Sequence, residues 1–352
     1  MNYIFNKFHL VIIIFLSLAV PSFAQGPAWS GHIEATYNYN ISGDTTVNML
    51  RSYDARSKQI QLNNVHIVAS GAPSDKVSYT AELDFGTDAA VHGLVHQTSL
   101  GSPVAVDVQE AYMTYAFSDQ FKFTGGKFVT FEGIEVIEGP VNPTISRGYL
   151  FGLAEAFTHV GAYFTFLPSS EIDIKLGIVN GWDLLIDNNP DKTIIGRFGV
   201  NLGDPLAFGI SGSWGVEQVG TDDARTSLDL TGVTKVIPGV ALNFQGNYGA
   251  ETFGTVDATW MGFGLQPVIA LSDNVDIGAR IEYFSDKDGV RTFGIEDFNA
   301  LNVTIVPTFK YDGFTFRFEY RFDNASDEIF PVSEDEPSKT SSTVSVGVSC
   351  NL

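Results

Sequence analysis

The stretch Phe-Thr-Phe-Arg-Phe-Glu-Tyr-Arg-Phe at residues 314–322 decides the fold class. Every even-numbered residue in it is aromatic, and every odd-numbered residue is polar or charged. Successive side chains of a β-strand point to opposite faces, so this stretch forms a strand with one aromatic face and one hydrophilic face. A strand that separates lipid from a water-filled lumen requires this pattern, because a charge in the middle of the lipid face costs roughly 2–4 kcal/mol.

The same alternation recurs along the chain and predicts sixteen strands. Seven short connections rich in turn residues alternate with eight that are longer on the whole, including 128–156 and 250–255. Short periplasmic turns, long extracellular loops and an even strand count are typical of a closed antiparallel transmembrane β-barrel. A phase change at Asn63-Asn64 predicts a β-bulge. The expected strands are 28–40, 56–69, 76–86, 104–117, 120–127, 157–167, 171–182, 192–202, 205–217, 224–236, 239–249, 256–271, 274–285, 297–311, 313–323 and 341–351.

The first 24 residues have the features of a secretory signal peptide. Lys7 precedes an apolar run from Leu10 to Val20, and Pro21-Ser22-Phe23-Ala24 supplies small residues at the cleavage positions. The run is shorter than the roughly 20 residues that a membrane helix needs, and no other long apolar helix is evident. We therefore expect cleavage after Ala24, with residues 25–352 forming one barrel domain in the outer membrane of a Gram-negative bacterium.

Composition limits the partners of the protein. The chain has 41 acidic and 20 basic residues and a net charge of −21, which excludes a nucleic-acid partner. The acidity is consistent either with solvated, mutually repelling loops or with a cation-favouring potential at a pore mouth. Cys350 is the only cysteine, so neither an intrachain disulfide nor a cysteine-based metal cage can form. The expected partners are outer-membrane lipid, small hydrophilic solutes or ions, and further copies of the chain.

One loop carries a family resemblance. Residues 142–152 read Asn-Pro-Thr-Ile-Ser-Arg-Gly-Tyr-Leu-Phe-Gly, residues 156–161 read Ala-Phe-Thr-His-Val-Gly, and Gly-Lys-Phe stands upstream at 126–128. These segments resemble the OmpL-like putative beta-barrel porin-2 family. The resemblance implies a pore-forming outer-membrane barrel without defining the solute. The strand pattern is also similar to that of phosphate-selective porins, but the excess of acids argues against phosphate.

Loop 128–156 is the longest connection and follows the fifth strand, where trimeric general porins fold a loop into the barrel. If it enters the lumen, Glu132, Glu135 and Glu138 would line a constriction and favour cations. The alternative is an acidic loop on the outer surface. Arg147 is expected to anchor the loop by pairing with Glu155 or a wall carboxylate.

Charged residues on lumen-facing strand positions could create a transverse field across the pore. They could equally pair across neighbouring strands, with modest energies in wet surroundings. The candidates are Lys122, Lys175, Arg197, Arg280, Arg317, Arg321, Glu82, Asp84, Glu282 and Glu319.

The sequence lacks the short motifs that are typical of catalytic, metal-binding or nucleotide-binding sites. The sequence contains no Gly-x-Ser-x-Gly elbow, no His-Glu-x-x-His and no Walker loop, so we expect neither an enzyme nor a cofactor. His92 and His96 have helical spacing, but the surrounding Gly and polar residues argue against a stable helix, and no metal site is expected. The predicted function is passive diffusion of small hydrophilic solutes. A porin specific for an organic nutrient and a non-conducting receptor or adhesin are the alternatives.

Overall fold

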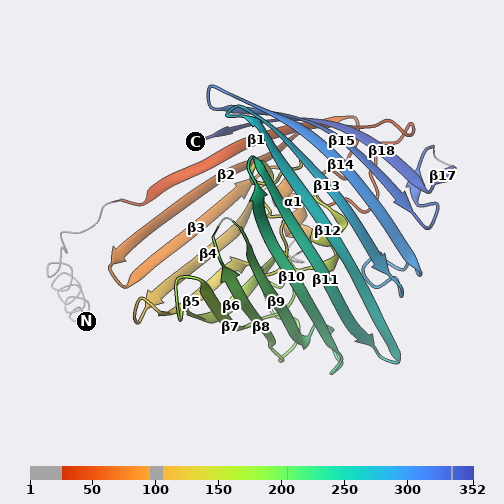
Figure 1. Cartoon of the computed structure of the whole chain (residues 1–352). Helices are drawn as coiled ribbons and strands as arrows, with labels where there is room; N and C mark the ends of the chain where they lie inside the picture. Colours follow the sequence, from red (N-terminus) through yellow and green to blue (C-terminus); the bar gives the residue numbers. More distant parts are fainter. Residues whose placement is uncertain (1–25, 96–105, 204, 334–335) are drawn as a thin grey trace, which may run out of the picture.

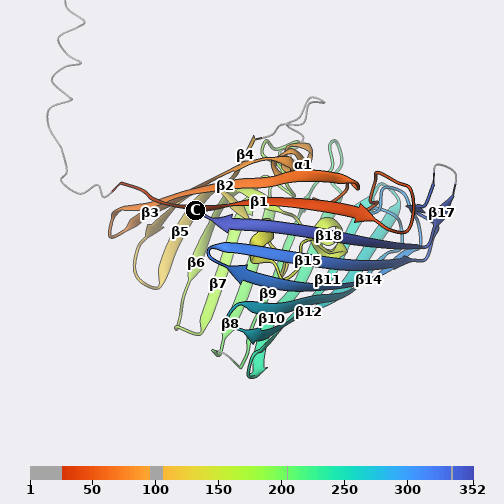
Figure 2. The same cartoon turned by 90° about the horizontal axis from the view of Figure 1, so that it is seen from above.

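The computed structural model describes residues 26–95, 106–203, 205–333 and 336–352. The expected signal peptide and His96 lie outside these residues. The described part of the chain is dominated by strands that run side by side around a common interior (Figures 1 and 2). None of the helices in these residues has both the length and the apolar character needed to cross a membrane.

Sixteen antiparallel strands of the described residues close into one barrel, in the order β1-β18-β15-β14 and then stepwise back to β2. All sixteen correspond to expected strands, with ends that differ by a few residues. Three short helical elements, α1 (Thr87–Val95), η1 (Gly139–Val141) and η2 (Leu150–Ala154), lie in loops, and β16 (Phe330–Pro331) pairs with β17 (Pro337–Ser338) in another. The barrel strands are β1 (Ala28–Asn40), β2 (Gln59–Ser74), β3 (Val77–Phe85), β4 (Val106–Ala116), β5 (Phe121–Val129), β6 (Thr158–Phe166), β7 (Ile172–Val179), β8 (Thr193–Asn201), β9 (Ala207–Val216), β10 (Ala224–Ile237), β11 (Val240–Phe253), β12 (Val256–Ser272), β13 (Val275–Asp286), β14 (Phe298–Tyr311), β15 (Phe314–Ala325) and β18 (Thr340–Asn351).

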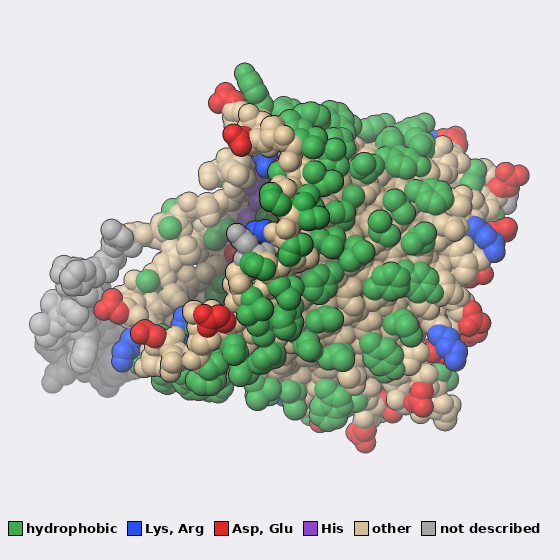
Figure 3. Space-filling view, in the orientation of Figure 1, with side chains coloured by type: hydrophobic (Ala, Val, Ile, Leu, Met, Phe, Trp, Pro, Cys, Tyr) green, Lys and Arg blue, Asp and Glu red, His purple; other side chains and the backbone are tan. Residues whose placement is uncertain are grey.

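The two faces of the strands separate as the alternation predicts. In β15, Phe318 is 46% exposed whereas Arg317 is 2% exposed, and the pattern continues through Tyr320 and Arg321. Figure 3 shows hydrophobic side chains spread over the outer face of the strands, with charged side chains towards its edges. The aromatic face of β15 therefore meets lipid, and its charged face meets the interior.

Closure of the barrel and the register of its strands determine which side chains face the lumen. β1 pairs with β18 through partners such as Ala35 and Val348, which leaves no open sheet edge. On the other side of β1 the register steps from Glu34–Asn64 to Ala35–Leu62, so Asn63 is the extra residue of a bulge. The bulge expected at this position is confirmed.

Two features of the connections differ from the sequence-based expectation. The connection expected at 250–255 is only Gly254 and Thr255, because β11 continues to Phe253 and Gly254 adopts a φ of 60° that permits a two-residue hairpin. The sequence argued against a stable helix around His92, but this segment forms the helix α1. Its residues Ala89 and His92 are buried against neighbouring segments, so tertiary packing outweighs the weak local propensity.

Candidate functional site

The loop between β5 and β6, residues 130–157, lies inside the barrel. The Ser211 hydroxyl of β9 donates to the carbonyl oxygen of Phe131 over 2.8 Å, and the Ser227 hydroxyl of β10 donates to Glu132 over 2.6 Å. These wall strands are several positions away from β5 and β6 around the barrel. Figure 2 shows the yellow chain of this loop within the ring of strands. The loop therefore crosses the lumen instead of lying on the outer surface.

Arg280 of β13 is the centre of one anchor of the loop. Its fully buried guanidinium donates to Glu135 Oε1 over 2.7 Å, to Thr144 Oγ1 over 2.9 Å and to the carbonyl oxygen of Ser146 over 2.6 Å. Gln266 of β12 donates to the same Glu135 oxygen over 2.8 Å. A buried charge is tolerated when it is paired and fully hydrogen-bonded, which describes this guanidinium.

A second anchor comes from Arg317 of β15. Its guanidinium donates to the carbonyl oxygens of Gly139 over 3.0 Å and Thr144 over 3.3 Å, and it pairs with Glu34 of β1. The arginine therefore joins the loop to two strands of the wall. Because Glu34 offsets its charge and loop carbonyls occupy its other donors, little of the charge of Arg317 remains available to a passing solute.

Wall carboxylates hold the loop through its amides. Glu319 of β15 accepts from the amides of Ile145 over 2.7 Å and Ser146 over 3.0 Å, and Glu282 of β13 accepts from the amide of Leu150 over 3.0 Å. A Cβ at Gly148 would lie 1.8 Å from a Glu282 oxygen. A larger residue at position 148 would force the Glu282 carboxylate to move from its place against the loop.

Arg321 and Asp323 of β15 complete the anchored side. Arg321 donates to the carbonyl oxygen of Arg147 over 2.6 Å, and Asp323 accepts from the Tyr149 hydroxyl over 2.8 Å. Asp323 also pairs with Arg51 of the first extracellular loop over 2.9 Å. Two loops and one strand therefore share a single buried ionic network.

The loop ends in a further carboxylate cap. Asp183, in the loop after β7, accepts from the amides of Phe157 over 2.6 Å and Thr158 over 3.0 Å. Burial raises the pKa of the Asp183 carboxyl to about 6, although both amide donors favour its charged form. The cap therefore aligns the chain where it enters β6.

The four predicted constriction residues have different surroundings. Glu132 and Glu135 are buried against β10 and β13, and burial raises the pKa of the Glu132 carboxyl to about 8, so it is largely protonated at neutral pH. Glu138 is half-buried and accepts from Gln109 of β4. Arg147 is buried within the loop.

Arg147 anchors the loop, but not to the partner expected. Its guanidinium donates to the carbonyl oxygens of Val136 over 3.1 Å and Ile145 over 2.9 Å, and to that of Ile137. It also lies 4.7 Å from the ring centroid of Tyr53. The expected pairing with Glu155 or a wall carboxylate is wrong, because the loop folds back so that its own carbonyls surround the guanidinium.

The other predicted wall residues lie on the side from β3 to β8. Arg197 pairs with Asp173 of the neighbouring strand over 3.2 Å, which is the cross-strand pairing expected as one alternative. The ammonium of Lys175 lies 4.9 Å from the ring centroid of Phe131 in the loop. Asp84 is fully buried, whereas Lys122 and Glu82 are half-buried.

Space remains on both sides of the loop. A cavity of about 740 Å³ at the hairpin end is lined by Ser78, Thr114 and Lys122 among others. A second, of about 390 Å³, lies between Gly133 of the loop and the walls that carry Asp173 and Arg197. At the opposite end, the first loop, α1 and η2 line a third of about 820 Å³.

Several residues of the site were not predicted. Gln109 and Glu110 of β4 and His66 of β2 face the loop from the wall, while Arg51 and Tyr149 belong to the buried network. The alternation that follows the bulge places His66 on the lumen-facing side of β2, so the sequence could have identified this residue. The positions of Arg51 and Tyr149 had no sequence signal, because they depend on how two loops fold.

Comparisons with known proteins agree with this architecture. The family described as "Putative beta-barrel porin-2, OmpL-like" matches residues 27–350. No curated protein matches the chain. Among solved structures, the trimer form of OmpT from Vibrio cholerae has 13% identity and a TM-score of 0.62 over 93% of this chain and 99% of that one.

Two other solved barrels are similar at the level of the fold. The outer-membrane channel DcaP of Acinetobacter baumannii has 10% identity and a TM-score of 0.62 over 93% of this chain and 97% of its own. An anion-selective porin from Comamonas acidovorans has 8% identity and a TM-score of 0.63 over 93% and 99%.

Proposed function

The chain belongs to the OmpL-like putative beta-barrel porin-2 family of the Gram-negative outer membrane, and from this premise we propose that it is a passive diffusion channel for small hydrophilic solutes with a preference for cations. The observation that carries the proposal is the loop 130–157, which narrows the lumen yet leaves cavities on both of its sides. The proposed activity involves no covalent chemistry.

The cation preference follows from how charges are distributed around the loop. Arg280, Arg317 and Arg321 are buried under the loop, and their donors are occupied by its oxygens and by wall carboxylates. Glu82 and Glu138 lie on the side of the lumen formed by β3 and β4. In the described part of the chain they form no ion pair with a Lys or Arg side chain. A lumen carboxylate that no lysine or arginine neutralises raises the local cation concentration.

Glu110 extends this acidic wall, which we define as Glu82, Glu110 and Glu138. Glu110 lies on β4 opposite Glu82 of β3, and its Oε1 accepts from the Val129 amide over 2.7 Å. Glu132 and Glu135 are left out of this wall because they contact Ser227 of β10 and Arg280 of β13, on other parts of the barrel. The acidic loop alone therefore does not set the proposed preference, which needs the wall as well.

Planar-bilayer recordings test both parts of the proposal. We expect an ohmic current and, in a salt gradient, a reversal potential on the cation-selective side. Replacing the three carboxylates of the acidic wall by Gln should move that potential towards zero, while Glu328→Gln in an exposed loop should leave it unchanged. Anion selectivity of the unmodified protein would refute the cation preference. Absence of current would refute the channel, and block by one organic nutrient would favour a solute-specific porin.

We also propose that the protein assembles as a homo-oligomer. Support comes from OmpT of Vibrio cholerae, a barrel of similar fold whose structure is described as a trimer form. Light scattering of the detergent-solubilised protein gives its mass, and a mass of one chain at all detergent concentrations would contradict the proposal.

A further inference from the structure

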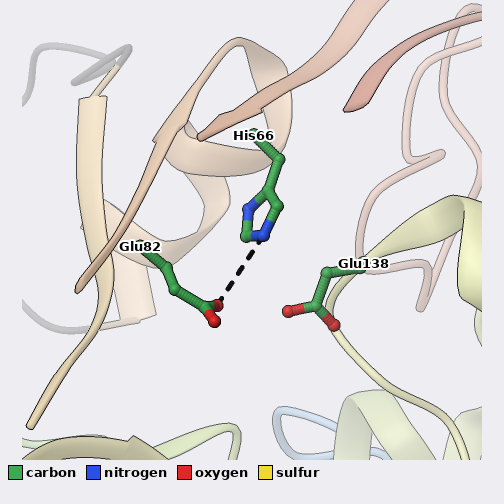
Figure 4. A group of neighbouring side chains, drawn as sticks. All are labelled: His66, Glu82 and Glu138. Carbon is green, nitrogen blue, oxygen red and sulfur yellow. Dashed lines mark ion pairs between the residues drawn. The ribbon is translucent and has the colours of Figure 1, made fainter. Parts of the chain in front are cut away.

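Three side chains with metal-ligating atoms converge beside the inserted loop. They are His66 of β2, Glu82 of β3 and Glu138 of the loop, and one ligand atom from each lies within 4.8 Å of the other two. Figure 4 shows the imidazole and the two carboxylates pointing towards a common centre from three separate segments. His66 Nε2 lies 3.7 Å from Glu82 Oε2.

The imidazole of His66 is oriented from behind by a carboxylate. Asp84, its register partner on β3, lies with Oδ1 2.7 Å from His66 Nδ1. A carboxylate that accepts the Nδ1 proton leaves the Nε2 lone pair directed at Glu82 and Glu138. Metal-binding histidines commonly have such a carboxylate behind them, because it selects the tautomer and raises the basicity of the ligand nitrogen.

A buried amide provides an independent indication of a ligand. Gln109 is fully buried, and its Nε2 donates to Glu82 over 3.4 Å and to Glu138. Its Oε1 has no hydrogen-bond partner among the described residues, and neither has Asp84 Oδ2. Buried polar atoms are normally partnered, and the two ends of an amide are exchanged by a simple flip. The Nε2 end of Gln109 therefore faces the two carboxylates, and a flip of this amide would turn its unpartnered oxygen towards an ion held between them.

We propose that His66, Glu82 and Glu138 bind one divalent transition-metal ion, such as Zn²⁺, at the junction of the loop and the wall. Zinc bonds to nitrogen and oxygen of about 2.1 Å allow two ligands on one ion to lie up to roughly 4.2 Å apart, so the flexible glutamates need to move by less than about 1 Å. The imidazole favours zinc, nickel or copper over calcium and magnesium, which prefer oxygen ligands alone.

The site has a consequence for the proposed channel. Glu82 and Glu138 belong to the acidic wall, so a bound divalent ion neutralises two of its three carboxylates and ties the loop to β2 and β3. Metal binding is therefore expected to reduce current. This second step rests on the proposed function, whereas the binding step does not.

Calorimetric titration of ZnCl₂ into the detergent-solubilised full-length protein tests the site itself. One saturable ion per barrel is expected. His66→Gln and Glu138→Gln should each weaken binding by at least about 100-fold, and Asp84→Asn, which removes only the orienting partner, by about 10–100-fold. Glu132→Gln is the matched control in the same loop, because its carboxyl is bound to Ser227 on another wall. Heat-modifiable migration in gels verifies that each variant is a folded barrel.

Absence of saturable Zn²⁺ binding would overturn the proposal, as would binding that survives both His66→Gln and Glu138→Gln in folded protein. Bilayer recordings with and without ZnCl₂ then test the effect on current, which should be reversed by a chelator and lost in Glu138→Gln. Binding without any change in an existing current would refute the placement of the ion in the conducting path. A barrel that binds Zn²⁺ but never conducts would refute the proposed function and leave the metal site standing.

Discussion

Arg280→Met is expected to loosen the inserted loop while the barrel stays intact. The guanidinium makes four hydrogen bonds to the loop, at Glu135, Thr144 and both the carbonyl oxygen and the hydroxyl of Ser146, and it is fully buried. Methionine retains much of the side-chain volume but none of the donors. The carboxylate of Glu135 would then be buried without its cationic partner.

The magnitude follows from the contacts that remain. Removing one partner of a buried ion pair costs about 3–5 kcal/mol. Glu135 keeps the Gln266 amide at 2.8 Å and the Gly148 amide at 2.6 Å, so the lower limit of about 3 kcal/mol is the appropriate figure. Since 1.4 kcal/mol is a factor of ten, the open state of the loop should become roughly 100-fold more populated.

Hydrogen exchange with mass spectrometry measures this population directly. Peptides that cover residues 140–152 contain the amides of Ile145 and Gly148, which are bonded to Glu319 and Glu135. Their exchange should accelerate roughly 100-fold, whereas peptides of β13 should keep their protection, because the strand hydrogen bonds do not depend on the loop.

Two variants serve as controls for this measurement. Lys310→Met removes a positive charge from the exposed pair with Asp276, a contact worth about 0–1 kcal/mol, and should leave the loop unchanged. Adding Glu135→Gln to Arg280→Met removes the unpaired carboxylate and should recover part of the protection. The reasoning is refuted if loop exchange rises less than about tenfold, or if β13 loses protection to the same extent.

Two predictions concern stability, measured by urea unfolding in lipid vesicles. Phe318→Arg on the lipid face of β15 should cost about 2–4 kcal/mol and Phe314→Arg, beside the hairpin turn, about 0–1 kcal/mol; equal costs would argue against this placement of the lipid boundary. Asp183→Asn should stabilise the protein at pH 8 by up to about 3 kcal/mol and leave it unchanged at pH 4. The pKa of the Asp183 carboxyl is raised in the folded state to about 6. Its contribution to the free energy of unfolding is therefore fully present below the unfolded pKa near 4 and is lost as the pH rises through 6. A variant less stable than the parent at pH 8 would contradict this reasoning.

The amino-acid sequence alone was sufficient to predict the barrel wall. Side-chain direction in a strand alternates residue by residue, and the boundary between lipid and water selects side chains by polarity, so both signals are local. The sixteen strands, the bulge at Asn63 and the inward set that includes Arg317 and Glu319 all follow from these two rules. The helix α1 escaped the same reasoning, because its stability comes from packing instead of propensity.

The interior was decided by tertiary structure. Glu135 and Arg280 are 145 positions apart, and Ile145 and Glu319 are 174 apart, so no local pattern could indicate that they meet. The sequence left open whether loop 128–156 lies inside or outside. That choice depends on whether buried arginines find enough loop oxygens to replace their water, which is a property of the closed barrel and its loop together. The meeting of His66, Glu82 and Glu138 has the same origin, because closure of the wall and entry of the loop must both occur before three separate segments can share one centre.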